Sequence, residues 1–215
     1  MVEDIRETAV LQRVKQGYTT GARTLASRSI VGLARTRITP NALTTAGVSL
    51  CLAAAVIVYF EYHNKLLFYW LGAFVFVVGS ILDILDGALA RAGGKTTPFG
   101  SFLDSTTDRV GEGAMLGAIA LIFARHGNEV ALGATIAAIA GSFLVSYTRA
   151  KAEALGLRGD VGLGSRAERV VAITAGLVLA PWGVLPWAIY LLTATAWLTV
   201  VQRILFVRKQ LRERR

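Results

Sequence analysis

Cysteine and charge are both scarce in this chain of 215 residues. The single cysteine, Cys51, excludes an internal disulfide framework, and its apolar surroundings favour a packing role. Charged residues make up only 17% of the sequence, whereas hydrophobic residues make up 54% and the mean hydropathy is +0.54. A soluble domain of this length seldom has so little charge. The composition therefore predicts a membrane protein.

Signals for processing and for further domains are lacking as well. The opening MVEDIRETAV has no charged leader followed by an apolar core and a small-residue cleavage site, so we expect insertion to depend on the mature spans. We find no convincing repeat, low-complexity tract or second domain. The net charge of +9 does not predict nucleic-acid binding, because the basic residues alternate with apolar blocks and do not gather on a polar face.

Six apolar segments are candidates to cross a bilayer, which takes about 20 residues in a helix. The fifth is short unless it begins earlier, near Ser165. The segments are residues 41–60, 66–90, 99–124, 130–149, 170–179 and 182–206. We therefore predict an all-α, polytopic membrane protein with six transmembrane helices.

We divide the chain into a cytoplasmic juxtamembrane segment (1–38), a six-helix membrane domain (39–208) and a basic cytoplasmic tail (209–215). In the first segment, apolar residues recur at helical spacing and basic residues lie off that stripe, which predicts an amphipathic helix in the membrane interface. A helix packed on its own protein is the alternative, because Gly17 and Gly21 weaken an independent helix. The apolar stripe consists of Leu11, Val14, Tyr18, Ala22 and Leu25.

Lysine and arginine are distributed unevenly between the two sides of the predicted spans. One side holds 20 of them, and the opposite loops hold only Lys65 and Arg125. Because the cytoplasmic side carries the basic excess, we predict that both termini are cytoplasmic in a cell (inner or plasma) membrane. The 20 basic residues lie in residues 1–40, 91–99, 149–169 and 203–215.

Four aspartates lie in or beside the second and third apolar segments. Ionised side chains are costly inside a span, so they normally face a cavity and carry function. Residues three and four apart share a helix face, and the loop AGGKTTP between the segments is short. We therefore expect antiparallel neighbouring helices whose acids converge near the cytoplasmic surface. The four are Asp83, Asp86, Asp104 and Asp108.

Four carboxylates this close together would repel one another unless a cation joins them. An all-oxygen set with no nearby histidine or cysteine favours a hard cation, so we predict Mg²⁺, with Mn²⁺ or Ca²⁺ as alternatives, and not zinc. On the same helix faces, Gly87 and Gly100 leave room for a ligand, and Arg91 offers a planar donor fork to a phosphate. The sequence therefore predicts a site for a metal-bridged diphosphate.

Buried ion pairs and helix packing are the alternatives for these residues. Gly87 and Gly100 would then serve close packing between membrane helices. Glu112 continues the face of the third-segment acids by one turn, either as a partner of the site or as an internally hydrogen-bonded or neutral acid. The ion pairs that this alternative allows are Asp83 or Asp86 with Arg91, and Asp108 with Arg109 or Arg149.

The pattern resembles the signature of CDP-alcohol phosphotransferases: D-x2-D-G-x2-A-R, then eight residues, then G-x3-D-x3-D. All eight fixed positions are matched over 26 residues. TPNALTTAG, from Thr39, is similar to the start of the family's first membrane helix, and the resemblance covers the six spans and the interfacial helix. The fixed positions are Asp83, Asp86, Gly87, Ala90, Arg91, Gly100, Asp104 and Asp108.

This resemblance implies an integral membrane enzyme, commonly a homodimer, that uses CDP-diacylglycerol. It implies that Asp83, Asp86 and Asp104 bind one or two metal ions, with Asp108 as general base and further ligand. The metal would polarise the diphosphate while Asp108 takes the proton of the attacking hydroxyl, without a covalent intermediate. The residues implied for CDP-lipid binding are Pro40, Thr44, Asp83, Asp86, Gly87, Arg91 and Gly100.

The signature does not name the acceptor alcohol, but the rest of the predicted cytoplasmic face is strongly basic. Five basic side chains lie at the ends of the fourth, fifth and sixth spans, where they can form a pocket for a phosphorylated acceptor. This arrangement, with its RAER stretch, resembles actinobacterial-type phosphatidylinositol phosphate synthases, which implies inositol phosphate as the acceptor. The five are Arg149, Lys151, Arg166, Arg169 and Arg203.

Two other functions fit parts of the sequence. A phosphatidylglycerophosphate synthase, or another family member with a different acceptor, is the nearer one. Retention-side charge that binds no ligand is a separate alternative for the basic residues. A cation transporter or channel would use the acids as ion ligands, but such acids should lie near the midplane or reach the far side. Here they cluster near one surface beside Arg91, which favours the enzyme.

Overall fold

The computed structural model describes residues 39–162 and 164–214 of the chain. Within these ranges the chain consists of helices joined by short connections, as the composition predicts. The predicted interfacial helix falls in residues 1–38 and lies outside the described residues. The helices are α2 (Pro40–Tyr59), α3 (Lys65–Ala92), α4 (Pro98–Arg125), α5 (Glu129–Ala154), α6 (Arg166–Val178) and α7 (Leu185–Glu213), with a short 3₁₀ helix, η1 (Ala180–Trp182), before α7.

The helices near the acids begin at clear local signals. The side chain of Thr39 accepts the N–H of Ala42 at 3.2 Å, and Pro40 follows in the first turn, where its missing N–H costs no hydrogen bond. Thr97 and Pro98 begin α4 in the same way. These caps determine where α2 and α4 begin, and therefore the position along each helix of the residues one and two turns later.

Two helix boundaries differ from a simple reading of the apolar segments. α6 begins directly after Ser165, because Ser165 and Glu168 form a reciprocal capping box. The early start that the sequence allowed for the fifth segment is therefore correct. α7 begins at Leu185 and continues to Glu213, so most of the expected tail over 209–215 belongs to this helix.

Among the described helices, α2, α3, α5 and α7 are long and apolar enough to cross a membrane. The chain is therefore a multi-pass membrane protein. α4 has 28 residues, but Asp104, Asp108 and Glu112 lie within its first 15 residues and make that part less apolar. α6 has only 13 residues. The prediction of six membrane-crossing helices is thus confirmed for four of them.

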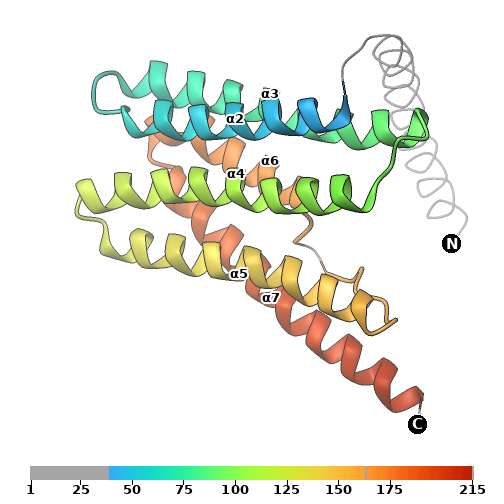
Figure 1. Cartoon of the computed structure of the whole chain (residues 1–215). Coiled ribbons are helices and arrows are strands. Elements are labelled where there is room, and N and C mark those ends of the chain that lie inside the picture. Colours follow the sequence, from blue (N-terminus) through green and yellow to red (C-terminus); the bar gives the residue numbers. More distant parts are fainter. Residues whose placement is uncertain (1–38, 163, 215) are drawn as a thin grey trace, which may run out of the picture.

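α2 packs along both α3 and α4, as Figure 1 shows. Two glycines allow its close approach to α3, because a Cβ at Gly47 would lie 2.9 Å from the carbonyl oxygen of Gly79, and a Cβ at Gly79 would lie 2.8 Å from that of Gly47. α3 and α4 touch each other at only a few points. The two helices therefore do not pack closely along their length, as neighbouring helices would, although their acids converge as expected. α2 is the helix that packs along both.

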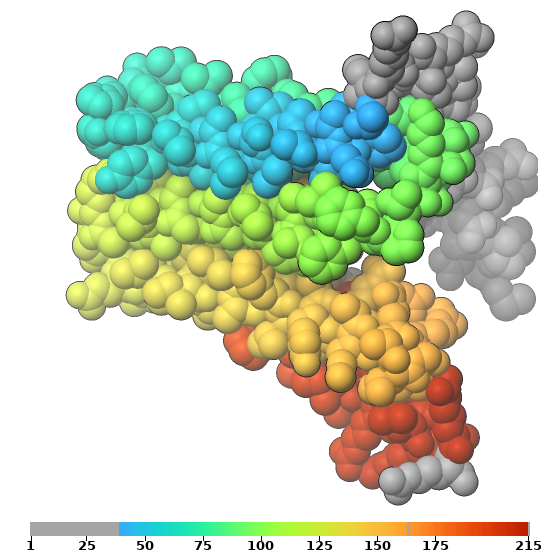
Figure 2. Space-filling view, in the orientation of Figure 1, coloured from blue at the N-terminus to red at the C-terminus, as the bar shows by residue number. Residues whose placement is uncertain are grey.

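The remaining helices complete the bundle on the other side of α4. On the face in Figure 2, α4 lies between α2 and α5, and α7 extends beyond α5. α6 packs against α3 and α7. Large apolar side chains such as Phe74, Phe102 and Trp187 are well exposed on the outer surface, as expected of helices that face lipid.

The two ends of the bundle differ in their connections. The start of α2, the α3–α4 loop, the α5–α6 connection and the end of α7 lie at one end in Figure 1. At the other end, the fully buried Glu61 lies 3.4 Å from Arg125 and 3.3 Å from His126. The signature residues belong to the first end, where the described basic segments after residue 90 also lie.

Candidate active site

Three carboxylates from α3 and α4 form an acidic cluster, which consists of Asp83, Asp104 and Asp108. Each offers an oxygen, and these three oxygens lie within 4.8 Å of one another. Asp83 is buried, and the other two are half-buried on α4, where a spacing of four residues places them on one face. The structure thus brings together three of the four predicted metal ligands.

Asp86 lies beside the acidic cluster and not within it. It is only 2% exposed, and its Oδ2 accepts a hydrogen bond from the hydroxyl of Thr44 on α2. Its Oδ1 is buried and accepts no hydrogen bond from the residues that the structure describes. Because a buried carboxylate oxygen needs a donor or a cation, this oxygen can serve a ligand at the edge of the cluster.

A cavity of 320 Å³, here called the signature cavity, opens beside Asp86 and Asp104. The first turns of α2 and α4 and the last turns of α3 form its wall. Asp83 is the one residue predicted to bind the CDP-lipid that does not line it. Those that do are Pro40, Thr44, Asp86, Gly87, Arg91 and Gly100. Sequence reasoning missed five further lining residues, Asn41, Lys95, Thr96, Thr97 and Ser101.

Gly87 and Arg91 share this cavity in a way that explains their spacing. A Cβ at position 87 would lie 3.2 Å from Nη1 of Arg91, closer than most such contacts. The guanidinium therefore folds back over the glycine, where a larger side chain would displace it. This places a planar donor group on the cavity wall, a position suited to a phosphate.

A second cavity of 480 Å³, here called the arginine cavity, lies between α4, α5, α6 and α7. Asp104 and Ser101 line both cavities, and Asp108 lines this one. Four of the five predicted acceptor residues line it: Arg149, Arg166, Arg169 and Arg203. Lys151 does not, because residues two apart on a helix face different sides and Arg149 occupies the inner one.

Arg166 is the cation that holds the acidic cluster. Its guanidinium hydrogen-bonds Asp83, and its Nη2 lies 2.8 Å from Oδ1 of Asp108. The ion-pair alternative considered for the sequence named other partners, of which only Arg109 is near, with Nη1 3.8 Å from Asp108. No local spacing signals the Arg166 pair, because 83 residues separate it from Asp83.

A second buried ion pair, Glu112 with Arg169, lies next to this arrangement. Nε of Arg169 donates to Oε1 of Glu112 at 2.7 Å, and Nη2 donates to Oε2 at 2.8 Å. Both side chains are only 5% exposed. The interpretation of Glu112 as an internally hydrogen-bonded acid is confirmed. Arg169 was predicted to contact the acceptor, and the structure shows it paired within the protein.

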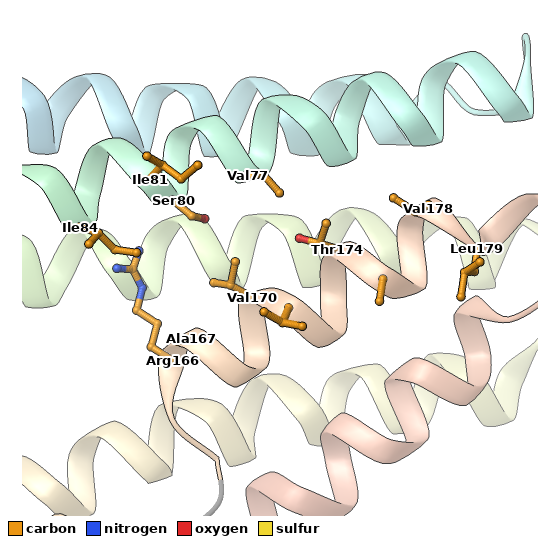
Figure 3. A pocket seen from close by; sticks show the side chains of 12 residues that line it. Val77, Ser80, Ile81, Ile84, Arg166, Ala167, Val170, Thr174, Val178 and Leu179 are labelled. Atoms are coloured by element: carbon orange, nitrogen blue, oxygen red, sulfur yellow. The ribbon is translucent and has the colours of Figure 1, made fainter. Parts of the chain in front are cut away.

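An apolar groove of 740 Å³ runs along α3 and α6 (Figure 3). Its walls include Val77, Ile81 and Ile84 from α3, and Val170 from α6. Arg166 lies at one end of the groove, and so links it to the arginine cavity. Sequence reasoning missed this groove, because apolar residues on a membrane helix do not reveal whether they face lipid or a hollow.

The chemistry of the donors fits a hard divalent cation. All four aspartates offer carboxylate oxygens, and neither cavity is lined by histidine or cysteine. Arg166 and the more exposed Arg109 offset only part of their combined negative charge. These residues can therefore hold Mg²⁺ or Mn²⁺, with Asp83, Asp104 and Asp108 as the compact set.

Residues 37–210 match the model of the CDP-alcohol phosphatidyltransferase family. The chain is 37% identical over 180 residues to the archaetidylinositol phosphate synthase of Pyrococcus horikoshii, covering 83% of this chain and 88% of that protein. It is 36% identical over 189 residues to the phosphatidylinositol phosphate synthase of Streptomyces avermitilis, covering 83% and 75%.

Solved structures of a phosphatidylinositol phosphate synthase are similar to this chain in fold as well as in sequence. The Mycobacterium tuberculosis phosphatidylinositol phosphate synthase with CDP-DAG bound has a TM-score of 0.75 and 31% sequence identity, over 86% of this chain and 94% of that one. The same enzyme in complex with manganese and citrate also has a TM-score of 0.75, at 32% identity, over 85% and 88%. Both sequence and fold therefore agree over most of the chain.

Proposed function

Because this chain belongs to the CDP-alcohol phosphatidyltransferase family, we propose that it transfers the phosphatidyl group of CDP-diacylglycerol to inositol phosphate. The products are phosphatidylinositol phosphate and CMP. The observation that carries this proposal is the position of Asp104, which lines both the signature cavity and the arginine cavity. A carboxylate at that boundary can act between a diphosphate donor on one side and a phosphorylated alcohol on the other.

The donor fits the signature cavity and the apolar groove. The CDP moiety would occupy the signature cavity, with its phosphates near Arg91 and a hydroxyl or base near Thr44. An acyl chain would lie in the groove between α3 and α6, whose walls are almost wholly apolar. The choice of CDP-diacylglycerol as the donor is supported by the M. tuberculosis relative, which was solved with CDP-DAG bound.

The four aspartates have two roles in this proposal, metal binding and proton acceptance. We propose that Asp83, Asp86 and Asp104 hold Mg²⁺, or alternatively Mn²⁺, with Asp108 as a further ligand. When bound, the metal supplies charge stabilisation for the diphosphate and for the departing CMP. Asp108 lines the arginine cavity, so its carboxylate can accept the proton of the acceptor hydroxyl as that oxygen attacks the β-phosphate, the one that carries the diacylglycerol. No protein nucleophile is required.

The arginine cavity supports a phosphorylated acceptor. Arg149, Arg166, Arg169 and Arg203 converge there from three helices, and guanidinium groups bind phosphate through paired donors. The two curated relatives described above, one archaeal and one bacterial, are both named as synthases of inositol phosphate lipids. An acceptor without a phosphate, such as inositol or serine, would make no use of these guanidinium donors.

A panel of acceptors tests this assignment. Purified enzyme with CDP-diacylglycerol and Mg²⁺ is offered inositol phosphate, glycerol phosphate, inositol or serine, and CMP release is measured. We expect kcat/KM for inositol phosphate to exceed that for inositol by about a hundred-fold or more. Inositol lacks the phosphate, so it loses several charge-assisted hydrogen bonds to the arginines, and together these contribute at least that factor. A higher efficiency with glycerol phosphate would reassign the enzyme to phosphatidylglycerophosphate synthesis.

We also propose that all six described helices form the membrane domain and that both termini face the cytoplasm. The end of the bundle that holds the signature also holds the described basic segments after residue 90, which supports this orientation. A reporter that is active only in the cytoplasm should be active when fused after residue 214. A reporter that is active only outside the membrane should be active when inserted within residues 126–128. An externally active fusion after residue 214 would reverse the orientation.

A further inference from the structure

We infer that the hydroxyls of Ser80 and Thr174 bind the ester carbonyl of the donor lipid, so that the enzyme distinguishes an ester-linked CDP-lipid from an ether-linked one. The inference rests on the proposed function, because it concerns the acyl chain assigned to the apolar groove between α3 and α6. With Arg166 at the end of the groove, these two residues are the polar members of a described wall that is otherwise apolar.

The two hydroxyls differ from most others on these helices. A hydroxyl on a membrane helix commonly donates to the carbonyl oxygen four residues earlier, because lipid offers no other partner. Thr135 and Thr193 do so at 2.7 and 2.8 Å. In contrast, Oγ of Ser80 and Oγ1 of Thr174 are buried and have no hydrogen-bond partner among the residues that the structure describes. Each of them can therefore donate to a ligand.

The surroundings of Ser80 make a partner for its hydroxyl valuable. Ser80 is only 5% exposed, so water competes little for this group. The thiol of Cys51 on α2 lies near the hydroxyl, but sulfur is a weak acceptor and satisfies it only in part. A buried hydroxyl without a good acceptor costs free energy, which an oxygen atom of a bound ligand would recover.

Both side chains lie at a depth that suits the ester group of a bound lipid. Ser80 precedes Asp83 by three residues, which places it about 4.5 Å deeper along α3 than the acidic cluster. A lipid whose phosphate is bound beside that cluster would bring its glycerol carbons, and then its ester group, to this level. Figure 3 shows both side chains directed into the groove, Ser80 from α3 and Thr174 from α6.

An ester carbonyl is the acceptor that fits these two donors. Its oxygen has two lone pairs, so it can accept a hydrogen bond from each wall of the groove. The acyl chain beyond the carbonyl is wholly apolar and suits the wall that Ile81 and Val170 form. An ether-linked chain has the same apolar part but no carbonyl oxygen, so it would leave both hydroxyls unpaired.

A comparison of two donors tests the inference. The purified enzyme, with Mg²⁺ and inositol phosphate in detergent micelles, is offered CDP-diacylglycerol or a CDP-dialkylglycerol with chains of equal length, and CMP release is measured. We expect the wild type to use the ester donor about five- to fifty-fold more efficiently. Ser80→Ala and Thr174→Val should each lower kcat/KM for the ester donor about two- to ten-fold, because each removes one hydrogen bond. Neither should change kcat/KM for the ether donor.

Two substitutions outside the groove are matched controls. Ser49→Ala and Thr195→Val remove hydroxyls that donate to carbonyl oxygens of their own helices, at 2.8 and 2.9 Å. Neither residue lines the groove, so both variants should keep the preference of the wild type for the ester donor. Thr174→Ser keeps a hydroxyl at the groove wall and should also remain close to the wild type.

Equal use of both donors by the wild type, or a preference for the ether donor, would overturn the inference. Equal losses with both donors in Ser80→Ala and Thr174→Val would also overturn it, because the hydroxyls would then act through packing, and so would no loss in either variant. A selective loss in one variant alone would remove the other residue from the site. Because the two residues lie on different helices, one variant decides if the other does not fold.

The same experiment separates the inference from the proposed function. If the wild type releases no CMP from either donor in the presence of inositol phosphate, the proposed function fails. If the wild type uses both donors and the variants show no selective loss with the ester donor, only the inference fails.

Discussion

Asp104→Asn should reduce turnover at saturating substrates by at least about a thousand-fold. Asp104 belongs to the acidic cluster and lines both cavities, so its charge acts on the metal and on the reacting phosphate together. Asparagine keeps the shape of the side chain but removes the negative charge. The diphosphate and the departing CMP would then lose the cation that offsets their charge. Asp83→Asn should have a similar effect, because Asp83 belongs to the same cluster.

The loss should appear in metal binding as well as in activity. Titration of the purified protein with Mn²⁺, followed by electron paramagnetic resonance, should show weaker binding in Asp104→Asn than in the wild type. Glu129→Gln is the control, because Glu129 is an exposed acid at the start of α5, at the opposite end of the bundle. Near-normal turnover of Asp104→Asn at high Mg²⁺ would remove Asp104 from the set of essential ligands.

Asp108→Asn should block transfer while leaving more of the binding intact. We expect turnover to fall about a hundred- to ten-thousand-fold, the usual range for loss of a general base, because the amide cannot accept the proton of the acceptor hydroxyl. Asp108 lines the arginine cavity but not the signature cavity, so its role lies on the acceptor side. Binding of Mn²⁺ and CDP-diacylglycerol should therefore be weakened less than in Asp104→Asn.

The comparison of the two variants separates their roles. Equal loss of Mn²⁺ binding in Asp108→Asn and Asp104→Asn would make Asp108 primarily a ligand. Retention of full turnover in Asp108→Asn would exclude it as the base and direct attention to another acid of the arginine cavity, of which Glu153 and Asp160 are the described examples.

Local sequence rules predicted most of the helices and the core of the site. The Thr-Pro pairs at positions 39 and 97 define two helix starts within one residue of the expected positions, because caps act over a single turn. The spacing of four between Asp104 and Asp108 placed both on one face for the same reason. These features depend on neighbours in sequence, so the sequence alone is enough to derive them.

The features that escaped prediction depend on contacts between distant segments. The sequence contains no sign that α2, and not α4, is the close neighbour of α3, because that choice depends on two glycines meeting across the interface. It gave no sign that Arg166 would pair with Asp83, 83 residues away. Lys151 was grouped with Arg149 by charge alone, although helical geometry already separates residues two apart.

The central claim is that this site transfers the phosphatidyl group of CDP-diacylglycerol to inositol phosphate and releases CMP. Its most direct test is to incubate the purified protein, Mg²⁺ and CDP-diacylglycerol with inositol phosphate that carries radioactive phosphorus, and to follow the label into lipid. We expect labelled lipid and CMP in equal amounts, both abolished by a chelator and both lost in Asp104→Asn. CMP release that leaves all the label in the aqueous acceptor would contradict the account.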